Sequence, residues 1–221
     1  MIKHKDHFHG SDLEKIEEIY GIKKEEIVSF SANVNPLGVS PLLRTTLADK
    51  IDAITTYPDR EYTSLRKCIA AYCGTDHENV IVGNGSTELI SLFIQIEHPK
   101  KAMIIGPTYS EYEREISLGG GTTLYYPLRE KDDFRLDVND FISHLNENID
   151  LLVICNPNNP TGTYVNSAKV EEFIRKLPDH VIPVVDEAYF EYVEDPTHYS
   201  LIKMIQEGYD RPLFVLRTFS K

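Results

Sequence analysis

Several short motifs place polar or ionisable side chains immediately after apolar runs of the chain. In chain order they are Gly83–Glu88, Pro107–Tyr109, Asn156–Gly162, Asp186–Tyr189 and Ser220–Lys221. A glycine turn that opens a helix can bind an anion, and a tyrosine ring can stack on a planar ligand. Amides and carboxylates can fix a ligand's polar atoms, and a lysine amine can act as a nucleophile. The set therefore contains the groups that a planar, phosphorylated ligand requires.

The glycine turn at residues 83–85 runs into a helix start at Ser86 and Thr87. Unpaired backbone N–H groups and the positive end of the helix dipole make such a start an anion site, and the two hydroxyls add donors. The alternative is a capping box, in which Ser86 or Thr87 caps the helix and Glu88 reaches back to it. The turn is not a Walker loop, because no lysine follows the second glycine.

Each of the other motifs has a functional and a structural interpretation. Tyr109 either stacks on a ligand or packs at a loop end. The segment Asn156–Gly162, with two X-Pro bonds, either holds an asparagine amide rigidly toward a ligand or only forms a turn. Asp186 follows a buried apolar run, so it either faces a cation or protonated ring nitrogen or caps the next turn. Lys221 follows an apolar run and a helix-start serine, which makes it a candidate amine nucleophile.

Apolar runs that alternate with helix-length segments must position these motifs. Strands are expected at Asn79–Val82, Ala102–Ile105, Thr122–Tyr126, Leu151–Cys155, Val181–Val185 and Leu213–Leu216. Short continuous apolar runs of this kind predict a mainly parallel sheet covered by helices on both faces, which is an α/β fold. In such sheets ligands bind beyond the carboxyl ends of the strands, where the motifs fall.

The first sixty residues have a different pattern. A helix capped by Ser11 and ended at Gly21 precedes a loop, and a second helix opens at Ser40. We therefore expect an N-terminal arm and small-domain segment over residues 1–61. The ligand-binding domain is expected over residues 62–221.

Composition excludes several classes of protein. The chain has 221 residues and a formal net charge of −12, so general binding of nucleic acid is not expected. Its longest aliphatic runs are far shorter than the roughly 20 residues of a transmembrane helix, and no secretory signal is recognisable. Three scattered cysteines suit a reducing compartment better than a disulfide scaffold. We expect a cytoplasmic protein that does not bind membranes.

Pyridoxal 5'-phosphate needs the groups that the motifs supply: an anion site, a stacking face, a donor to the ring hydroxyl, a counter-charge for the pyridine nitrogen and an amine. With Tyr57–Asp59 added, the same motifs make the sequence resemble the class I/II aminotransferases, which are pyridoxal-phosphate enzymes of fold type I. The resemblance covers essentially all of the chain. It implies a three-layer sandwich with a mainly parallel sheet as the large cofactor domain.

The resemblance also implies roles for individual residues. Lys221 resembles the lysine that forms the internal aldimine and moves the proton at the substrate Cα, and Asp186 the partner of the pyridinium nitrogen. Asn159 and Tyr189 resemble the residues that donate to the ring oxygen, and Tyr109 resembles the residue that stacks on the ring. The residues that match phosphate contacts are Ser86, Thr87 and Ser220. Tyr57 resembles a tyrosine that reaches the phosphate from the neighbouring subunit, so the resemblance implies a homodimer with shared sites.

Two subfamilies compete, and both act on small phosphorylated amino compounds: threonine-phosphate decarboxylases and histidinol-phosphate aminotransferases. The stretch around Asn33 and the pair His9-Gly10 are more similar to the decarboxylases, in which the equivalents of these three residues approach the substrate; Asn159 is a further expected substrate contact. The chain departs from that subfamily after Gly10, where Ser11 and Asp12 stand in place of Gly-Asn. A metal site at His4, His7 and His9 is a weaker alternative, because no partner cluster accompanies them.

Chains of this family normally continue past the Ser-Lys pair to a phosphate-binding arginine and a small C-terminal domain with a substrate-carboxylate arginine. Neither is present here, so we expect a fragment of a longer polypeptide or a chain interrupted at a modified lysine. The alternative from a different functional class is a non-catalytic protein that retains the fold.

Overall fold

The computed structural model describes residues 12–31, 33, 35, 37–145 and 148–221. The chain divides into two compact units. One consists of Met1–Thr56 with Ser220–Lys221, and the other of Tyr57–Phe219. The boundary expected at residues 61 and 62 stays a prediction.

The first unit contains the helices α1 (Leu13–Tyr20) and α2 (Pro41–Asp49). The Asp12 carboxylate caps α1 by accepting a hydrogen bond from the Lys15 N–H, and Gly21 ends it in the left-handed conformation, with φ of 68°. The N-cap is thus Asp12, and the expectation of Ser11, which itself lies outside the described residues, is wrong. Ser40 caps α2 through the Leu43 N–H, as its sequence predicts.

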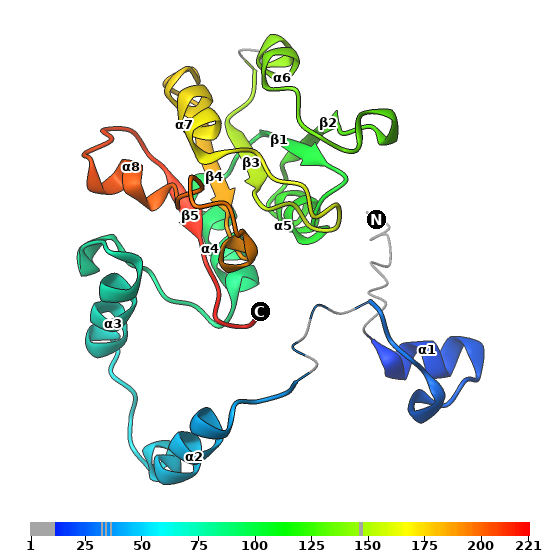
Figure 1. Ribbon diagram of the computed structural model, residues 1–221, viewed down its shortest axis with the longest axis vertical. Coiled ribbons are helices and arrows are strands. Elements are labelled where there is room, and N and C mark those ends of the chain that lie inside the picture. The colour runs from blue at the N-terminus through cyan, green and yellow to red at the C-terminus, as the bar shows by residue number, and fades with distance from the viewer. Residues whose placement is uncertain (1–11, 32, 34, 36, 146–147) are drawn as a thin grey trace. The chain divides into compact units, whose positions relative to one another are not determined.

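The second unit is built on a five-stranded sheet in the order β2-β1-β3-β4-β5 with every pairing parallel (Figure 1). The strands are β1 (Lys101–Gly106), β2 (Thr122–Pro127), β3 (Leu151–Cys155), β4 (Ile182–Asp186) and β5 (Phe214–Leu216). All of them lie where apolar runs predicted strands. The α/β fold with a parallel sheet is therefore confirmed.

The strand expected at Asn79–Val82 is wrong. Asn79 ends a 3-10 helix, and the residues after it form no strand in the described part of the chain. An apolar run becomes a strand only where a neighbouring strand takes its backbone hydrogen bonds. At Val80 a side chain binds the backbone instead of a strand: Arg66 Nε donates a hydrogen bond to the Val80 carbonyl at 2.9 Å.

Helices cover both faces of the sheet. On one face α4 (Ser86–Glu97) and α5 (Glu111–Leu118) pack on a hydrophobic cluster that includes Ala102, Ile104 and Val153. On the other, α6 (Val138–His144), α7 (Ser167–Arg175) and α8 (Ile202–Gln206) pack on a cluster that includes Met103 and Ile105. Neighbouring strand residues alternate between the two clusters, as the period of two in a strand requires, so the unit has three layers.

The second unit also contains α3 (Thr63–Cys73), which Gly74 ends. Short 3-10 helices lie at Lys24–Glu26, Ile51–Thr55, His77–Asn79, Glu130–Asp132 and Phe190–Tyr192. None of the helices in the described ranges is long and apolar enough to cross a membrane.

Candidate functional site

The carboxyl ends of neighbouring parallel strands lie at one edge of the sheet (Figure 1). The strands β1, β3 and β4 end there at Gly106, Cys155 and Asp186, and Cys155 is directly opposite Asp186 in the register. The loops after these strands contain the Tyr109, Asn159 and Asp186 motifs. The sheet thus brings together segments that are far apart in the sequence.

Asp186 is the last residue of β4 and is only 3% exposed. Val184, two residues earlier, belongs to the cluster under α4 and α5, so the strand period directs Asp186 to the same face. Its Oδ2 accepts a hydrogen bond from the Tyr112 hydroxyl at 2.5 Å, and its Oδ1 accepts one from the Ala188 N–H at 2.9 Å. Two donors to one carboxyl group favour its ionised form.

Tyr109 connects this carboxylate with the start of α4. Its ring lies edge-on to that of Tyr112, with centroids 5.6 Å apart and planes at 84°. Its hydroxyl is 3.4 Å from Thr87 Oγ1, in the first turn of α4. Contacts therefore run from the N-terminus of α4 through two aromatic rings to Asp186.

The start of α4 differs from the capping box, whereas the anion site stays a prediction. The N-cap is Gly85, with φ of 81°, and not Ser86 or Thr87. Glu88 does reach back, but its Oε2 accepts from the Asn84 N–H, at 2.5 Å. The first N–H groups of the helix have no intrahelical acceptor, so they remain available to an anion beside the half-buried Ser86 and Thr87 side chains.

The loop after β3 contains three asparagines with different surroundings. The Asn156 amide exchanges two hydrogen bonds with the Val165 backbone, at 2.9 and 2.8 Å. The Asn158 amide donates to the Pro107 carbonyl and to Thr161. Asn159 is half-buried, and its side chain makes no hydrogen bond to another described residue. Asn156 and Asn158 therefore shape the loop, and Asn159 is the amide that can turn to a ligand.

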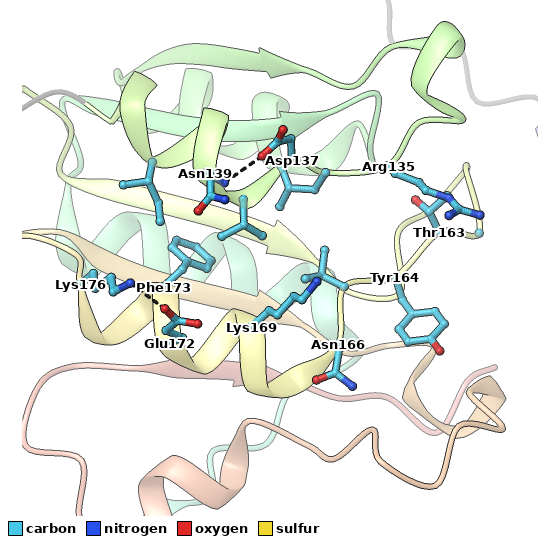
Figure 2. A pocket seen from close by; sticks show the side chains of 15 residues that line it. Arg135, Asp137, Asn139, Thr163, Tyr164, Asn166, Lys169, Glu172, Phe173 and Lys176 are labelled. Carbon is cyan, nitrogen blue, oxygen red and sulfur yellow. Dashed lines mark hydrogen bonds and ion pairs between the residues drawn. The ribbon is translucent and has the colours of Figure 1, made fainter.

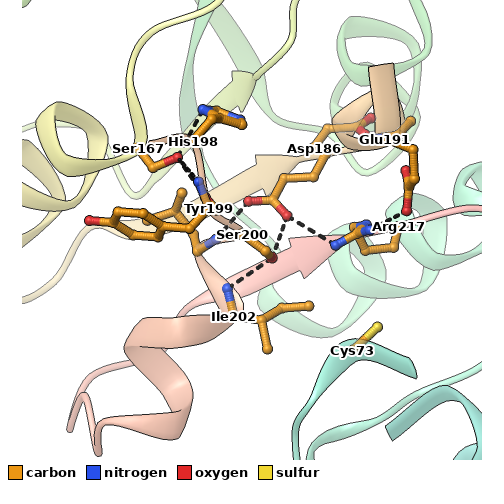
Figure 3. A network of polar contacts seen from close by, with 12 residues as sticks. Cys73, Ser167, Asp186, Glu191, His198, Tyr199, Ser200, Ile202 and Arg217 are labelled. Carbon is orange, nitrogen blue, oxygen red and sulfur yellow. Dashed lines mark hydrogen bonds and ion pairs between the residues drawn. The ribbon is translucent and has the colours of Figure 1, made fainter. Parts of the chain in front are cut away.

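Glu187, next to Asp186, points to the opposite side of β4. It is 1% exposed and accepts hydrogen bonds from the Leu201 N–H at 2.7 Å and from the Ser200 hydroxyl at 2.6 Å. Arg217 Nη1 lies 3.5 Å from Glu187 Oε2. Arg217 also pairs with Glu191, as Figure 3 shows. Burial raises the pKa of Glu187 to about 7, although these hydrogen bonds and Arg217 oppose the shift.

The other predicted site residues make none of the contacts that link Thr87, Tyr109, Tyr112 and Asp186. Tyr189 follows in the turn after β4 and is half-buried, and Tyr57 is 97% exposed. Asn33 is exposed and belongs to the first unit, as do Ser220 and Lys221, so their association with the strand ends stays a prediction. His9 and Gly10 lie outside the described residues, as do His4 and His7.

The sequence interpretation missed Tyr112, Glu187 and Arg217. The signal for Tyr112 is weak: it is a second tyrosine, three positions after Tyr109, and it lies in the first turn of α5. For Glu187 and Arg217, the sequence contains only a carboxylate and a guanidinium next to apolar runs. Their pairing depends on the order of β4 and β5 in the sheet.

A separate pocket of about 780 Å³ opens between α6 and α7 (Figure 2). Its lining includes Arg135, Tyr164, Lys169 and Glu172. None of the predicted site residues lines it. Among the residues that the structure describes, no group of His, Cys, Asp and Glu side chains is arranged to bind a metal ion.

Comparison with known proteins gives the family. The family model for aminotransferase class I and II matches residues 25–221. The chain belongs to this family. Class I and II aminotransferases depend on pyridoxal 5'-phosphate, so the family and the cofactor expected from the sequence are confirmed.

Relatives of this aminotransferase-family chain have two different names. A histidinol-phosphate aminotransferase of Geobacillus thermodenitrificans is 33% identical over 96% of this chain and 57% of its own length. A Caldanaerobacter subterraneus protein, provisionally named threonine-phosphate decarboxylase, is 38% identical over 86% of this chain and 51% of its own. The chain thus spans little more than half the length of these relatives.

A solved structure shows the same fold. The histidinol-phosphate aminotransferase of Sinorhizobium meliloti, crystallised in complex with pyridoxal-5'-phosphate, matches with a TM-score of 0.81 at 24% sequence identity. The match covers 100% of this chain and 61% of that one.

Proposed function

We propose that this aminotransferase-family chain binds pyridoxal 5'-phosphate at the strand ends and acts on a small phosphorylated amino compound. The observation that carries the proposal is the series of contacts from the start of α4 through Tyr109 and Tyr112 to Asp186. At one end the helix dipole favours an anion, and at the other a buried carboxylate favours a cation.

The polarity of this cluster fits the cofactor. Pyridoxal phosphate has a phosphate at one end, a basic ring nitrogen at the other and an aromatic ring between them. Ser86, Thr87 and the first N–H groups of α4 would bind the phosphate, Tyr109 would lie against the ring, and Asp186 would face the nitrogen. Asn159 and Tyr189 would donate to the ring oxygen. Asn159 is the asparagine of this loop whose amide is not engaged in hydrogen bonds within the loop.

The bound cofactor supplies an electron sink for the bond that breaks at the substrate Cα. Asp186 keeps a proton on the ring nitrogen, because its ionised carboxylate makes loss of that proton unfavourable. Lys221 supplies the amine that carries the cofactor and moves a proton at the substrate Cα. Ser220 would add a contact to the cofactor phosphate. Tyr57 would supply a further phosphate contact across a homodimer interface, and its side chain, 97% exposed in the isolated chain, is accessible to a neighbouring subunit.

For the substrate, we favour O-phosphothreonine and its decarboxylation. The stretch around Asn33 and the pair His9-Gly10 support this proposal, with the 38% identity to the Caldanaerobacter protein. Substrate anchoring decides which bond at Cα lies perpendicular to the ring, and only that bond overlaps with the electron sink. In this proposal, His9 and Asn33 bind the substrate so that the carboxylate takes the perpendicular position.

Amino transfer from histidinol phosphate to 2-oxoglutarate is the second candidate. It is supported by the relative from Geobacillus, which aligns with 96% of the chain. Histidinol phosphate has no carboxylate, so only a proton can leave its Cα.

The test supplies the full-length protein with each substrate separately. We expect carbon dioxide from O-phosphothreonine and no glutamate from histidinol phosphate with 2-oxoglutarate. Glutamate without carbon dioxide would replace our first candidate with the second. Absence of both products from a protein that contains the cofactor would instead support a non-catalytic role.

A further inference from the structure

Tyr112 is a buried residue of α5 to which the proposed chemistry assigns no role. We propose that Tyr112 positions the Asp186 carboxylate and keeps it ionised, so that their hydrogen bond controls how firmly the cofactor's ring nitrogen retains its proton. This inference rests on the proposed function. It makes Tyr112 a positioning residue, because it acts through Asp186.

The geometry of the pair is that of a strong hydrogen bond. The two oxygens are 2.5 Å apart, in the range of a hydroxyl that donates to a carboxylate. Tyr112 is 1% exposed and Asp186 3%, so water does not compete for either group. The Ala188 N–H binds the other carboxylate oxygen at 2.9 Å. One donor on each oxygen fixes the plane of the carboxyl group.

Tyr112 stays a donor over the whole working range of pH. Burial raises the pKa of its phenol well above the usual value, and the Asp186 charge adds to the shift. The titratable group that faces the pair from β3 is Cys155, and burial raises the pKa of its thiol to about 11. Around neutral pH the phenol and the thiol are therefore both uncharged.

Tyr112 also contacts the ring expected to lie against the cofactor. Its edge-on contact with Tyr109 means that α5 supports the stacking ring and the counter-charge together. A phenylalanine at position 112 could keep this aromatic contact but could not donate to Asp186. Tyr112→Phe therefore separates the hydrogen bond from the packing.

A matched control exists on the other face of the sheet. Tyr126 is 8% exposed and donates to Asp140 Oδ2 at 2.6 Å, and its ring is edge-on to Phe141. Tyr126→Phe removes the same kind of hydrogen bond away from the candidate site. It shows what loss of a tyrosine-to-aspartate hydrogen bond costs when no cofactor depends on it.

The first measurement follows the absorbance of the bound cofactor as the pH is lowered. Protonation of Asp186 would remove the negative charge beside the ring nitrogen and so change the absorbance, and a carboxylate that has lost a donor takes up its proton at higher pH. We expect the midpoint of the absorbance change to move to higher pH in Tyr112→Phe, and cofactor affinity to fall about tenfold. Tyr126→Phe should have the same absorbance midpoint and the same cofactor affinity as the wild-type protein. A Tyr112→Phe variant that also matches the wild type would overturn the inference.

The second measurement needs no cofactor and therefore remains valid if the proposed function fails. A double-mutant cycle on the apoprotein compares the loss of stability from Tyr112→Phe in the wild-type and Asp186→Asn backgrounds. We expect a clearly smaller loss with asparagine, because a neutral amide gains less from the donor than a carboxylate does. Equal losses in both backgrounds would show that Tyr112 only packs. If the wild-type protein binds no cofactor, the proposed function fails, whatever this cycle shows.

If Tyr112→Phe does not fold, 3-fluorotyrosine at position 112 preserves the shape and strengthens the donor. The absorbance midpoint should then move to lower pH. An unchanged midpoint would contradict the inference.

Discussion

The buried Glu187 and the half-buried Arg217 lie close enough to form an ion pair, which joins the end of β4 to the residue that follows β5. Their closest oxygen and nitrogen are 3.5 Å apart, and Glu187 is 1% exposed. The Glu187 N–H also donates to the Leu216 carbonyl, at 2.9 Å. The Arg217 guanidinium carbon lies 4.4 Å from the centre of the Phe190 ring. Asp186 and Glu187 are thus neighbours with separate surroundings, one toward α5 and one beside β5.

The stability of the protein should depend on the protonation of Glu187. Its pKa in the folded state is about 7, above the unfolded value of 4.5, so the folded state binds the proton more tightly. The stabilisation is complete below about pH 4.5 and is lost as the pH rises through 7. A shift of this size corresponds to about 3 kcal/mol. Glu187→Gln cannot titrate, so its free energy of unfolding should fall less than that of the wild type between pH 5 and 8.

Denaturant unfolding over this range checks the prediction. Glu172→Gln is the control, because Glu172 is exposed and pairs with Lys176 at 2.6 Å on the surface of α7. Its stability profile should run parallel to that of the wild type. A parallel profile for Glu187→Gln as well would show that Glu187 does not titrate in this range.

Asp186→Asn preserves the shape of the carboxyl group and removes its charge. We expect turnover of the full-length enzyme to fall about a hundredfold or more, because the ring nitrogen loses the charge that keeps it protonated. Steady-state kinetics at saturating cofactor separates this effect from weaker binding. Turnover close to that of the wild type would leave Asp186 only as the residue that caps the Ala188 turn.

The asparagines after β3 should respond differently to substitution. Asn159→Ala should weaken cofactor binding with little change in stability, because its amide has no hydrogen bond to another described residue. Asn156→Ala should cost about 2 kcal/mol of stability, because two backbone groups of Val165 lose their partner. Thermal unfolding and cofactor titration of both variants test the assignment. The reverse pattern would move the ligand contact to Asn156.

The sequence was sufficient to predict the five strands of the sheet and to predict that the candidate site lies at their carboxyl ends. Leu151–Cys155 and Phe214–Leu216 are continuous apolar runs, and such runs become buried parallel strands wherever a neighbour is present. The run at Asn79–Val82 is similarly apolar after its first residue but has no described strand beside it, so composition alone could not exclude it. Tyr112 and Asp186 are 74 positions apart, and only the packing of α5 on the sheet brings their oxygens together.

Lys221 should hold the cofactor covalently. Borohydride treatment of the full-length protein should remove the visible absorbance and leave a mass increase on the peptide that contains Lys221. Lys221→Ala should lose this adduct, whereas Lys203→Ala, at an exposed position on α8, should retain it. Peptide mapping by mass spectrometry distinguishes the two. An adduct on another lysine in the wild-type protein would show that the amine has been assigned to the wrong residue.

Tyr57 should act on the site of a neighbouring subunit. The proposal assigns it a phosphate contact, but its side chain is 97% exposed in the isolated chain. Separately, Tyr57→Phe and Lys221→Ala should each have low activity. In a mixed dimer, one of the two sites combines a wild-type Tyr57 from one subunit with a wild-type Lys221 from the other, so mixing the variants should restore part of the activity. Differently tagged subunits, purified in sequence, prove that exchange has occurred. Mixed dimers that stay as inactive as their parents would place Tyr57 in the site of its own subunit, or outside the site.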